Sequence, residues 1–124
     1  MSTEICPFCK PDREIVLRSD TCLAIYDKYP VNKGHMLVIP KRHVKDYFDL
    51  DHSEVESIWN MVHQVKKFLD SEYHPQGYNI GFNIGHDAGQ TIDHVHIHVI
   101  PRYKGDMDDP TGGVRHVIPE RGKY

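Results

Sequence analysis

Residues 94–100, HVHIHVI, carry three histidines at alternate positions, separated by bulky aliphatic side chains. In an extended strand successive side chains point to opposite faces, so His94, His96 and His98 share one face. The aliphatic residues share the other face, where packing into a core explains them. Three imidazoles in a row have no such explanation and indicate chemistry. The alternative is a strand whose histidines only face solvent or a satisfied polar pocket.

A regular strand can bring two of these histidines to one metal ion, but hardly all three. The rise of about 3.3 Å per residue puts His94 and His98 roughly 13 Å apart, whereas zinc needs nitrogen ligands at about 2.1 Å. At least one histidine therefore has another task. Neutral imidazole is a nucleophile that forms an N–P bond on phosphorus, and water can later break that bond. A histidine on the same face can bond a phosphate oxygen or protonate the leaving group.

The segment before the histidines, GHDAGQT (85–91), indicates a phosphate site. Its glycines match neither a Walker loop nor the dinucleotide fingerprint. Gly89, Gln90 and Thr91 nevertheless offer a close backbone approach, an amide and a hydroxyl, all of which suit phosphoryl oxygens. A hairpin loop that needs glycine for its turns is the alternative. Because this loop leads directly into the histidine strand, we favour its interpretation as a phosphate-binding loop.

Cys6 and Cys9 form a C-x-x-C pair, which is half of a zinc site. A redox pair is another use, but no thioredoxin-like βαβ pattern follows it. Two further ligands are needed, and histidines are abundant in this chain. Two free buried thiols remain the alternative. Cys22 lies in an apolar run and is expected to be a small core residue.

Strands are predicted on both sides of one long helix. Residues 14–27 (EIVLRSDTCLAIYD) indicate two strands around a turn at Ser19-Asp20, and HMLVIP (35–40) indicates a third. YNIGFNI (78–84) is a further strand before the glycine-rich segment. This order predicts an α+β fold with a sheet and helical cover. We expect a single domain over residues 1–124, with its core at about 6–102 and an irregular tail at 103–124.

The helix is predicted to begin at Asp51, with Glu54 as its capping-box partner. It should end near Tyr73, because Pro75 disfavours a helical backbone at the residue before it. Apolar residues recur at helical spacing, so one face should pack on the sheet: Val55, Ile58, Trp59, Val62, Val65 and Leu69.

Composition excludes several partners. The hydrophobic share of 39% and the charged share of 27% are those of a soluble globular protein. A net charge of −3 gives no basic field, so we expect no nucleic-acid partner. No apolar run has the length of a signal sequence or a membrane span, so no membrane partner is expected. Three cysteines, an odd number, favour a reducing compartment, and we expect the cytoplasm.

Three blocks together resemble the histidine triad (HIT) family: GHMLVIPKRH (34–43), NIGHDAGQT (83–91) and HVHIHVI (94–100). The H-x-H-x-H pattern is the defining motif of that family, and the blocks follow its order and spacing. The resemblance implies a homodimeric α+β fold, an antiparallel sheet with one long helix and a short helix packed on it. It also implies a hydrolase or nucleotidyl transferase that cleaves at the α-phosphate of a purine nucleotide through a covalent nucleotidyl-histidine. The implied substrates are dinucleoside polyphosphates, nucleoside phosphoramidates or nucleotidyl sugars.

The resemblance further implies roles for single residues. His96 would be the nucleophile, with His94 beside it, and His98 would contact the phosphate and the leaving-group oxygen. His35 would support the active strand from behind. Asp27 would hold the ribose hydroxyls, Gln90 and Thr91 would bond the phosphate and leaving-group side, and Asn83 would line the same site. Gly89, in the same loop, is expected to bind substrate with them.

Family members that carry a C-x-x-C pair, like their uridylyltransferase relatives, use it with two histidines. The matching positions here are His43 and His94, which would complete a structural zinc site with Cys6 and Cys9. Zinc would pin the N-terminal segment against the histidine strand. No organic cofactor is expected.

Two other functions stay open. In one, His94 and His96 hold a catalytic metal that activates water. In the other, the protein is a nucleotide-binding interaction or regulatory protein whose hydrolysis is slow or incidental. The branch of the family is also open, since Gln90-Thr91 and PRYKGD (101–106) resemble the fragile-histidine-triad branch. C-x-x-C and PKRH resemble the bacterial and phosphoramidase side. Arg115 and His116 in the tail could meet further phosphates, or could be solvated.

Overall fold

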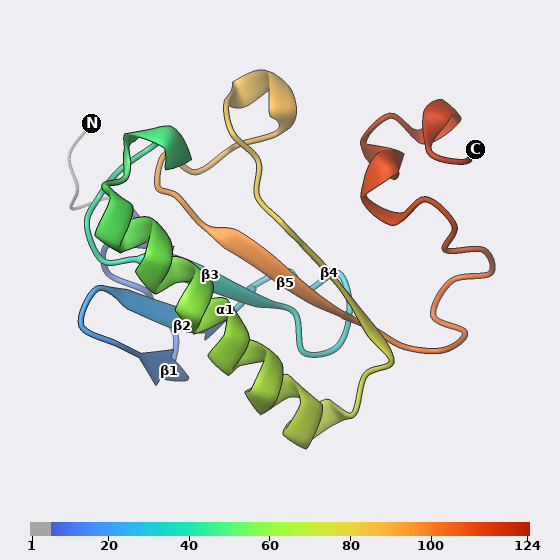
Figure 1. The fold of residues 1–124 in the computed structure, drawn as a ribbon, viewed down its shortest axis with the longest axis horizontal. Coiled ribbons are helices and arrows are strands. Elements are labelled where there is room, and N and C mark those ends of the chain that lie inside the picture. The colour runs from blue at the N-terminus through green and yellow to red at the C-terminus, as the bar shows by residue number, and fades with distance from the viewer. Residues whose placement is uncertain (1–5) are drawn as a thin grey trace.

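A five-stranded antiparallel sheet forms the centre of the computed structural model, which describes residues 6–124 (Figure 1). The order of strands across it is β1-β2-β3-β5-β4. Because β5 lies between β3 and β4, the last strand of the chain occupies an inner position. The strands are β1 (Leu17–Arg18), β2 (Cys22–Tyr26), β3 (Met36–Pro40), β4 (Gly77–Gly81) and β5 (Ile97–Arg102).

Helix α1 (His52–Tyr73) covers one face of the sheet (Figure 1). Asp51 caps it by accepting the Glu54 N–H at 2.9 Å, and the Glu54 carboxylate accepts the Asp51 N–H at 3.0 Å. The helix ends where His74 adopts a left-handed φ of 54°, directly before Pro75. Both predicted boundaries and the capping box are therefore confirmed. In the part of the chain that the structure describes, α1 is accompanied by short 3-10 turns, of which η2 (Tyr47–Asp49) directly precedes it.

Alternate residues of β2 and β3 face opposite sides of the sheet, and both sides are buried. Towards α1 lie Cys22, Ala24, Met36 and Val38. On the opposite face, Phe8 and Cys6 cover a second apolar cluster made by Leu23, Ile25, Leu37 and Ile39. Burial on both faces explains why these strands are continuously apolar rather than alternating. Cys22 is fully buried in the helix-side core, as predicted.

The buried face of α1 differs from the predicted one at Trp59 and Met61. Trp59, expected in the core, is 37% exposed, and its indole N–H donates to the Tyr47 hydroxyl at 3.4 Å. Met61 is 1% exposed and packs in the helix-side core. Trp59 lies at the edge of the apolar stripe, where a large aromatic side chain can keep its polar N–H near water.

The histidine run enters the sheet later than predicted. Strand β5 begins at Ile97, since the Val95 N–H donates to the Val44 carbonyl at 2.7 Å instead of joining the ladder. The alternation nevertheless continues outside the regular strand, because Val95, Ile97 and Val99 all pack in the helix-side core. Strand β4 is shorter than the predicted 78–84 and ends at Gly81.

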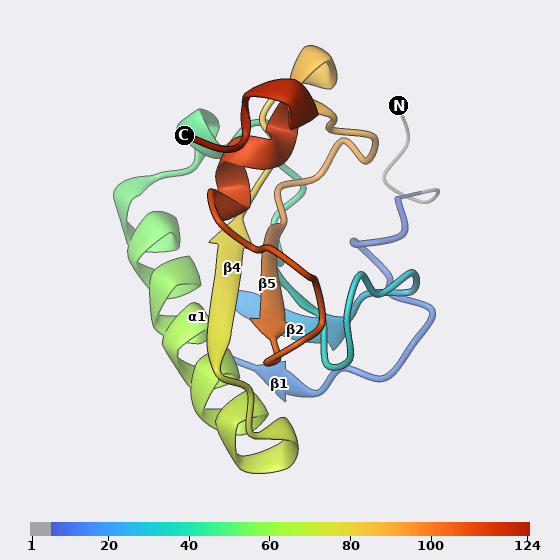
Figure 2. The same cartoon turned by 90° about the vertical axis from the view of Figure 1, so that its right-hand side faces the viewer.

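The C-terminal tail forms two 3-10 turns, η4 (Gly113–Val117) and η5 (Pro119–Arg121), and returns beside β4 (Figure 2). Gly113 lies close to Asn79 of that strand. Residues 1–5 of the predicted single domain lie outside the described residues. Within residues 6–124, no helix is both long enough and apolar enough to cross a bilayer.

Candidate functional site

A pocket of about 930 Å³ opens beside the histidine run. His96 and His98 line it together with Asp27 and His35, and the apolar side chains include Leu37, which lies on the sheet face opposite α1. The volume lies within the range of about 300–1,000 Å³ that small-molecule sites occupy. Four chemically active side chains therefore meet at one cavity of a size that suits a small molecule.

Among residues 6–124, the ring of His96 has a hydrogen-bond partner at only one of its two nitrogens. Its Nδ1 lies 2.8 Å from the backbone oxygen of His94. A carbonyl oxygen can only accept, so Nδ1 carries the proton and Nε2 keeps its lone pair. Burial lowers the pKa of His96, which keeps the ring neutral. A neutral imidazole with a free Nε2 at a pocket is the form that nucleophilic catalysis requires.

His98 and His35 contact each other through their rings. His35 Nε2 lies 3.0 Å from His98 Nδ1, and the backbone N–H of Val31 donates to His35 Nδ1 at 3.0 Å. Burial, with His96 and His35 as neighbours, lowers the pKa of His98 to about 4. Burial also lowers the pKa of His35. Both rings are therefore neutral at physiological pH.

Asp27 ends β2's apolar run and lies at the same pocket. One carboxylate oxygen accepts the Tyr29 N–H at 2.8 Å. The other lies 3.4 Å from His35 Nε2 and 3.8 Å from His98 Nδ1. Because His35 is neutral, its contact with Asp27 is a long hydrogen bond at most and not an ion pair.

The glycine-rich loop is built around Gln90. Its amide oxygen accepts the Gly85 N–H, and its NH₂ group donates to the carbonyl oxygens of Lys45 and Ile92. Gln90 is buried and lies outside the pocket lining, whereas Asn83, Gly89 and Thr91 line the pocket. Gly85 and Gly89 have φ values of 92° and 98°, which explains the glycines by the turns that they form.

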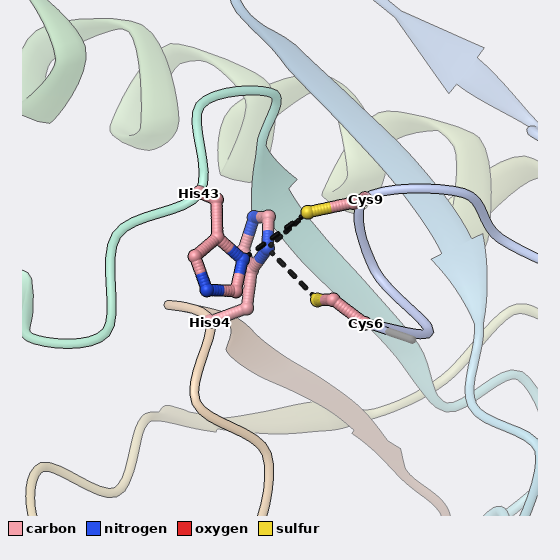
Figure 3. Close-up of side chains that lie close together, drawn as sticks. All are labelled: Cys6, Cys9, His43 and His94. Carbon is pink, nitrogen blue, oxygen red and sulfur yellow. Dashed lines mark hydrogen bonds between the residues drawn. The ribbon is translucent and has the colours of Figure 1, made fainter. Parts of the chain in front are cut away.

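Cys6, Cys9, His43 and His94 meet in one cluster, with their ligand atoms all within 4.8 Å of one another (Figure 3). Cys6 and Cys9 come from the N-terminal segment, His43 from the loop after β3, and His94 from the run before β5. The Nδ1 atom of His94 lies 3.3 Å from the Cys6 sulfur and 3.6 Å from the Cys9 sulfur. The Cys9 sulfur lies 3.1 Å from His43 Nδ1.

This cluster fits tetrahedral zinc. Ligands at about 2.3 Å for sulfur and 2.1 Å for nitrogen lie roughly 3.6 Å apart on a tetrahedron. The His94 Nε2 donates to the Pro40 carbonyl oxygen at 2.7 Å, so the neutral ring has its lone pair at Nδ1, towards the thiols. Metal-bound histidines usually donate their second N–H in this way. His94 itself is fully buried and lies outside the pocket lining, so its backbone oxygen is its contact with His96.

The sequence interpretation missed Phe8, which lies between the two cysteines. Its ring packs edge-on against His96, with centroids 4.9 Å apart, and it lines the pocket. Its position inside C-x-x-C was the available signal, because any segment tied to His94 must also approach His96. In the tail, Val114 and His116 line the pocket, while Arg115 donates to the Gly122 and Arg121 carbonyl oxygens.

Comparison with known proteins relates this chain to one family, the HIT domain proteins. The HIT domain profile matches residues 10–105. The chain is 33% identical over 121 residues to an AP-4-A phosphorylase of Mycobacterium tuberculosis, covering 95% of this chain and 62% of that relative. It is 36% identical over 96 residues to the bis(5'-nucleosyl)-tetraphosphatase (asymmetrical) of Schizosaccharomyces pombe, covering 77% and 53%. The chain thus spans less than two thirds of either relative.

A solved structure described as a zinc-bound histidine triad family protein from Mycobacterium smegmatis superposes with a TM-score of 0.77. The two sequences are 32% identical, and the match covers 87% of this chain and 82% of that one. The agreement in fold therefore extends over most of both chains.

Proposed function

Since the chain belongs to the histidine triad (HIT) family, we propose that it is a nucleotide hydrolase or nucleotidyl transferase. It would cleave at the α-phosphate of a dinucleoside polyphosphate or a nucleoside phosphoramidate. The names of the two curated relatives, which concern dinucleoside polyphosphates, support this substrate class. The observation that carries the proposal is the free Nε2 of His96 at the pocket.

The proposed reaction has two steps. The Nε2 lone pair of His96 attacks the α-phosphorus, an N–P bond forms, and the bond to the leaving group breaks with its electron pair on that group. The ring then carries a positive charge, which the His94 carbonyl stabilises by accepting the Nδ1–H at 2.8 Å. Water or another acceptor next attacks phosphorus and gives up its proton to the solvent, while the N–P bond breaks with its electron pair returning to Nε2 of His96. His98 would bond a phosphate oxygen during both steps.

Substrate contacts follow from the pocket lining. Asp27 would accept hydrogen bonds from the ribose hydroxyls, while Gly89 and Thr91 would bond phosphate oxygens and Asn83 would line the same side. Gln90 would act on the phosphate through the loop, because its amide is already engaged with backbone groups.

Cys6, Cys9, His43 and His94 would hold a structural zinc ion. Four protein ligands leave no position for water, so the ion would stabilise the fold and the chemistry would stay with His96. The name of the zinc-bound structural relative supports this assignment. By holding His94, the ion would also fix the carbonyl that orients His96.

We also propose a cytoplasmic homodimer. Strand β4 ends the sheet, and the outer edge of a terminal strand offers backbone groups for pairing with a second copy. Light scattering coupled to size-exclusion chromatography should give twice the chain mass. A monomer at micromolar concentration would contradict this part of the proposal.

Substitution of the nucleophile tests the enzyme assignment. His96→Gly should lower kcat for diadenosine tetraphosphate about 10³-fold or more, as removal of a catalytic nucleophile does. Binding of AMP should be retained. Intact-protein mass spectrometry during turnover should show one nucleotidyl group on the parent protein and none on the variant.

His63→Ala is the matched control, because His63 is an exposed histidine on α1 far from the pocket lining. It should turn over like the parent. A His96 variant with a tenth of the parent rate would reject the covalent role. Tight nucleotide binding by the parent without release of mononucleotide would instead favour a binding protein.

A further inference from the structure

We propose that the backbone N–H of Val31 fixes the protons of His35 and His98, making His98 a neutral hydrogen-bond donor to the substrate. The same contact closes the cluster of Asp27, His35 and His98 to divalent cations. Only the role of His98 towards substrate rests on the proposed function. The positions of the protons follow from the geometry alone.

The first contact sets the proton on His35. The Val31 N–H lies 3.0 Å from His35 Nδ1, and a backbone amide can only donate. Nδ1 must therefore hold a lone pair, and the neutral ring carries its proton on Nε2. His35 is 2% exposed, so no water competes for this arrangement across most of its surface.

The second contact, between His35 Nε2 and His98 Nδ1, determines which nitrogen of His98 carries the proton. With its proton on Nε2, His35 donates to His98 Nδ1 at 3.0 Å. His98 then carries its own proton on Nε2, the nitrogen left for a ligand in the pocket. A second proton on His98 would have to sit on Nδ1, facing the N–H of His35. The chain of contacts thus opposes the cationic form of His98.

Asp27 is the charged group that opposes this arrangement. Its carboxylate favours protonated rings, but it lies 3.4 Å from His35 Nε2 and 3.8 Å from His98 Nδ1. Both distances exceed that of the direct ring contact. His96, the other titratable neighbour of His98, has its proton on Nδ1 and adds no negative charge. The short contacts therefore decide the proton positions.

The same cluster has the spacing of a metal site. The three ligand atoms of Asp27, His35 and His98 lie within 4.8 Å of one another. Separations of 3.0, 3.4 and 3.8 Å resemble the roughly 3.0–3.4 Å between ligands that surround an ion at about 2.1 Å. A metal would, however, need a lone pair on His35 Nε2. With Nδ1 accepting from Val31, His35 would have to become an imidazolate.

His94 provides the contrast within the same chain. Its second nitrogen donates to the Pro40 carbonyl, the polarity that leaves a lone pair for a metal. The second nitrogen of His35 accepts from an amide, which is the reverse polarity. One backbone group thus separates a metal-binding histidine from one that donates to its neighbour.

Imidazole ¹⁵N spectra of the zinc-loaded protein test the proton positions without any substrate. His35 and His98 should both be protonated on Nε2, and His96 should show the opposite tautomer as an internal contrast. A proton on Nδ1 of His35 would overturn the inference. Cobalt(II) titration of the same sample should show no ion at Asp27, and uptake that shifts His98 Nδ1 would also overturn it.

Replacement of Val31 by its α-hydroxy acid changes the Pro30–Val31 amide to an ester, which replaces the N–H with an oxygen and makes the Pro30 carbonyl a weaker acceptor. The ester oxygen then faces the Nδ1 lone pair, so the proton of His35 should move to Nδ1. We expect kcat to fall about tenfold, the equivalent of one lost hydrogen bond, with KM nearly unchanged. Val31→Ala keeps the amide and should leave the ¹⁵N pattern unchanged. An unchanged tautomer of His35 in the ester protein would reject the proposal.

A second pair of variants tests the link from His35 to His98 if the ester protein does not fold. His35→Gln can place an NH₂ group near the position of Nε2, whereas His35→Asn is too short to reach His98. The proton of His98 should stay on Nε2 in the glutamine variant and be shared between both nitrogens in the asparagine variant. Equal spectra would contradict the link. The spectra require no turnover. An inactive parent protein would therefore refute the proposed function, while the proton positions of His35 and His98 could still be measured.

Discussion

The three histidines of the run 94–98 differ in what each ring nitrogen contacts. His94 donates to a carbonyl and offers Nδ1 to the cysteine cluster. His96 donates to the carbonyl of His94 and keeps Nε2 free. His98 accepts from His35. Identical side chains are therefore suited to the three proposed roles, metal ligand, nucleophile and hydrogen-bond donor, because their hydrogen-bond partners differ.

Asp27 is expected to bind the ribose. Asp27→Asn should weaken binding of AMP by about 1.5–3 kcal/mol, the range for hydrogen bonds to a charged group. The asparagine oxygen can still accept the Tyr29 N–H, so the loop should be preserved. Binding of 2',3'-dideoxy-AMP, which lacks the hydroxyls, should hardly change. Isothermal titration with both ligands measures the difference, and equal losses would argue against a ribose contact.

At the scale of elements, the position of β5 between β3 and β4 assembles both sites. It sets His94 against the end of β3, where the Pro40 carbonyl accepts its N–H, and it sets His98 against His35. The N-terminal segment then covers the face opposite α1, with Phe8 against His96. The cluster of Cys6, Cys9, His43 and His94 and the pocket thus share the segment that carries His94 and His96.

Zinc should stabilise the N-terminal segment on the sheet. Cys9→Ser should lower zinc content from about one ion per chain and lower Tm, because metal binding adds free energy only to the folded state. Cys22→Ala is the control, since this buried thiol lies in the helix-side core outside the cluster. It should destabilise the core and leave zinc content unchanged. Metal analysis that finds no zinc in protein purified without chelator, with both N-terminal thiols titratable, would disprove the site.

At the scale of the whole molecule, acid should destabilise the fold through its buried histidines. The pKa of His98 is about 4 in the folded state, against about 6.5 in an unfolded chain. Above pH 6.5 both states are neutral and the group contributes nothing. Between pH 6.5 and about pH 4, His98 is protonated in the unfolded chain but stays neutral in the folded chain. The free energy of unfolding therefore falls as the pH is lowered through this range.

Urea unfolding at pH 7.5 and pH 4.5 measures this effect. His98→Gln should reduce the acid-induced loss by about 2 kcal/mol, less than the full pKa difference implies because the ring is partly exposed. His63→Gln, on the exposed side of α1, should leave the loss unchanged. All variants keep the cluster of Cys6, Cys9, His43 and His94, so any change there affects each of them equally. An identical loss in the His98 variant would contradict this assignment.

The sequence by itself was sufficient for the elements with local signals. The Asp51 capping box and Pro75 bound α1 because both act on backbone groups within a turn of themselves. The alternation of the histidine run predicted its two faces because successive side chains of an extended segment point in opposite directions. The C-x-x-C spacing indicated that Cys6 and Cys9 form half of a metal site, whereas their two histidine partners came from the family resemblance.

Tertiary structure alone decided what each of these groups does. Cys6 meets His94 across 88 positions and His35 meets His98 across 63, so both contacts depend on the order of strands in the sheet. The Gln90 side chain is buried because its amide pairs with backbone groups of Gly85, Lys45 and Ile92, and it therefore does not line the pocket. Which nitrogen of a histidine holds the proton depends on the group opposite that nitrogen. That group is set by packing, and residue type and spacing do not specify it.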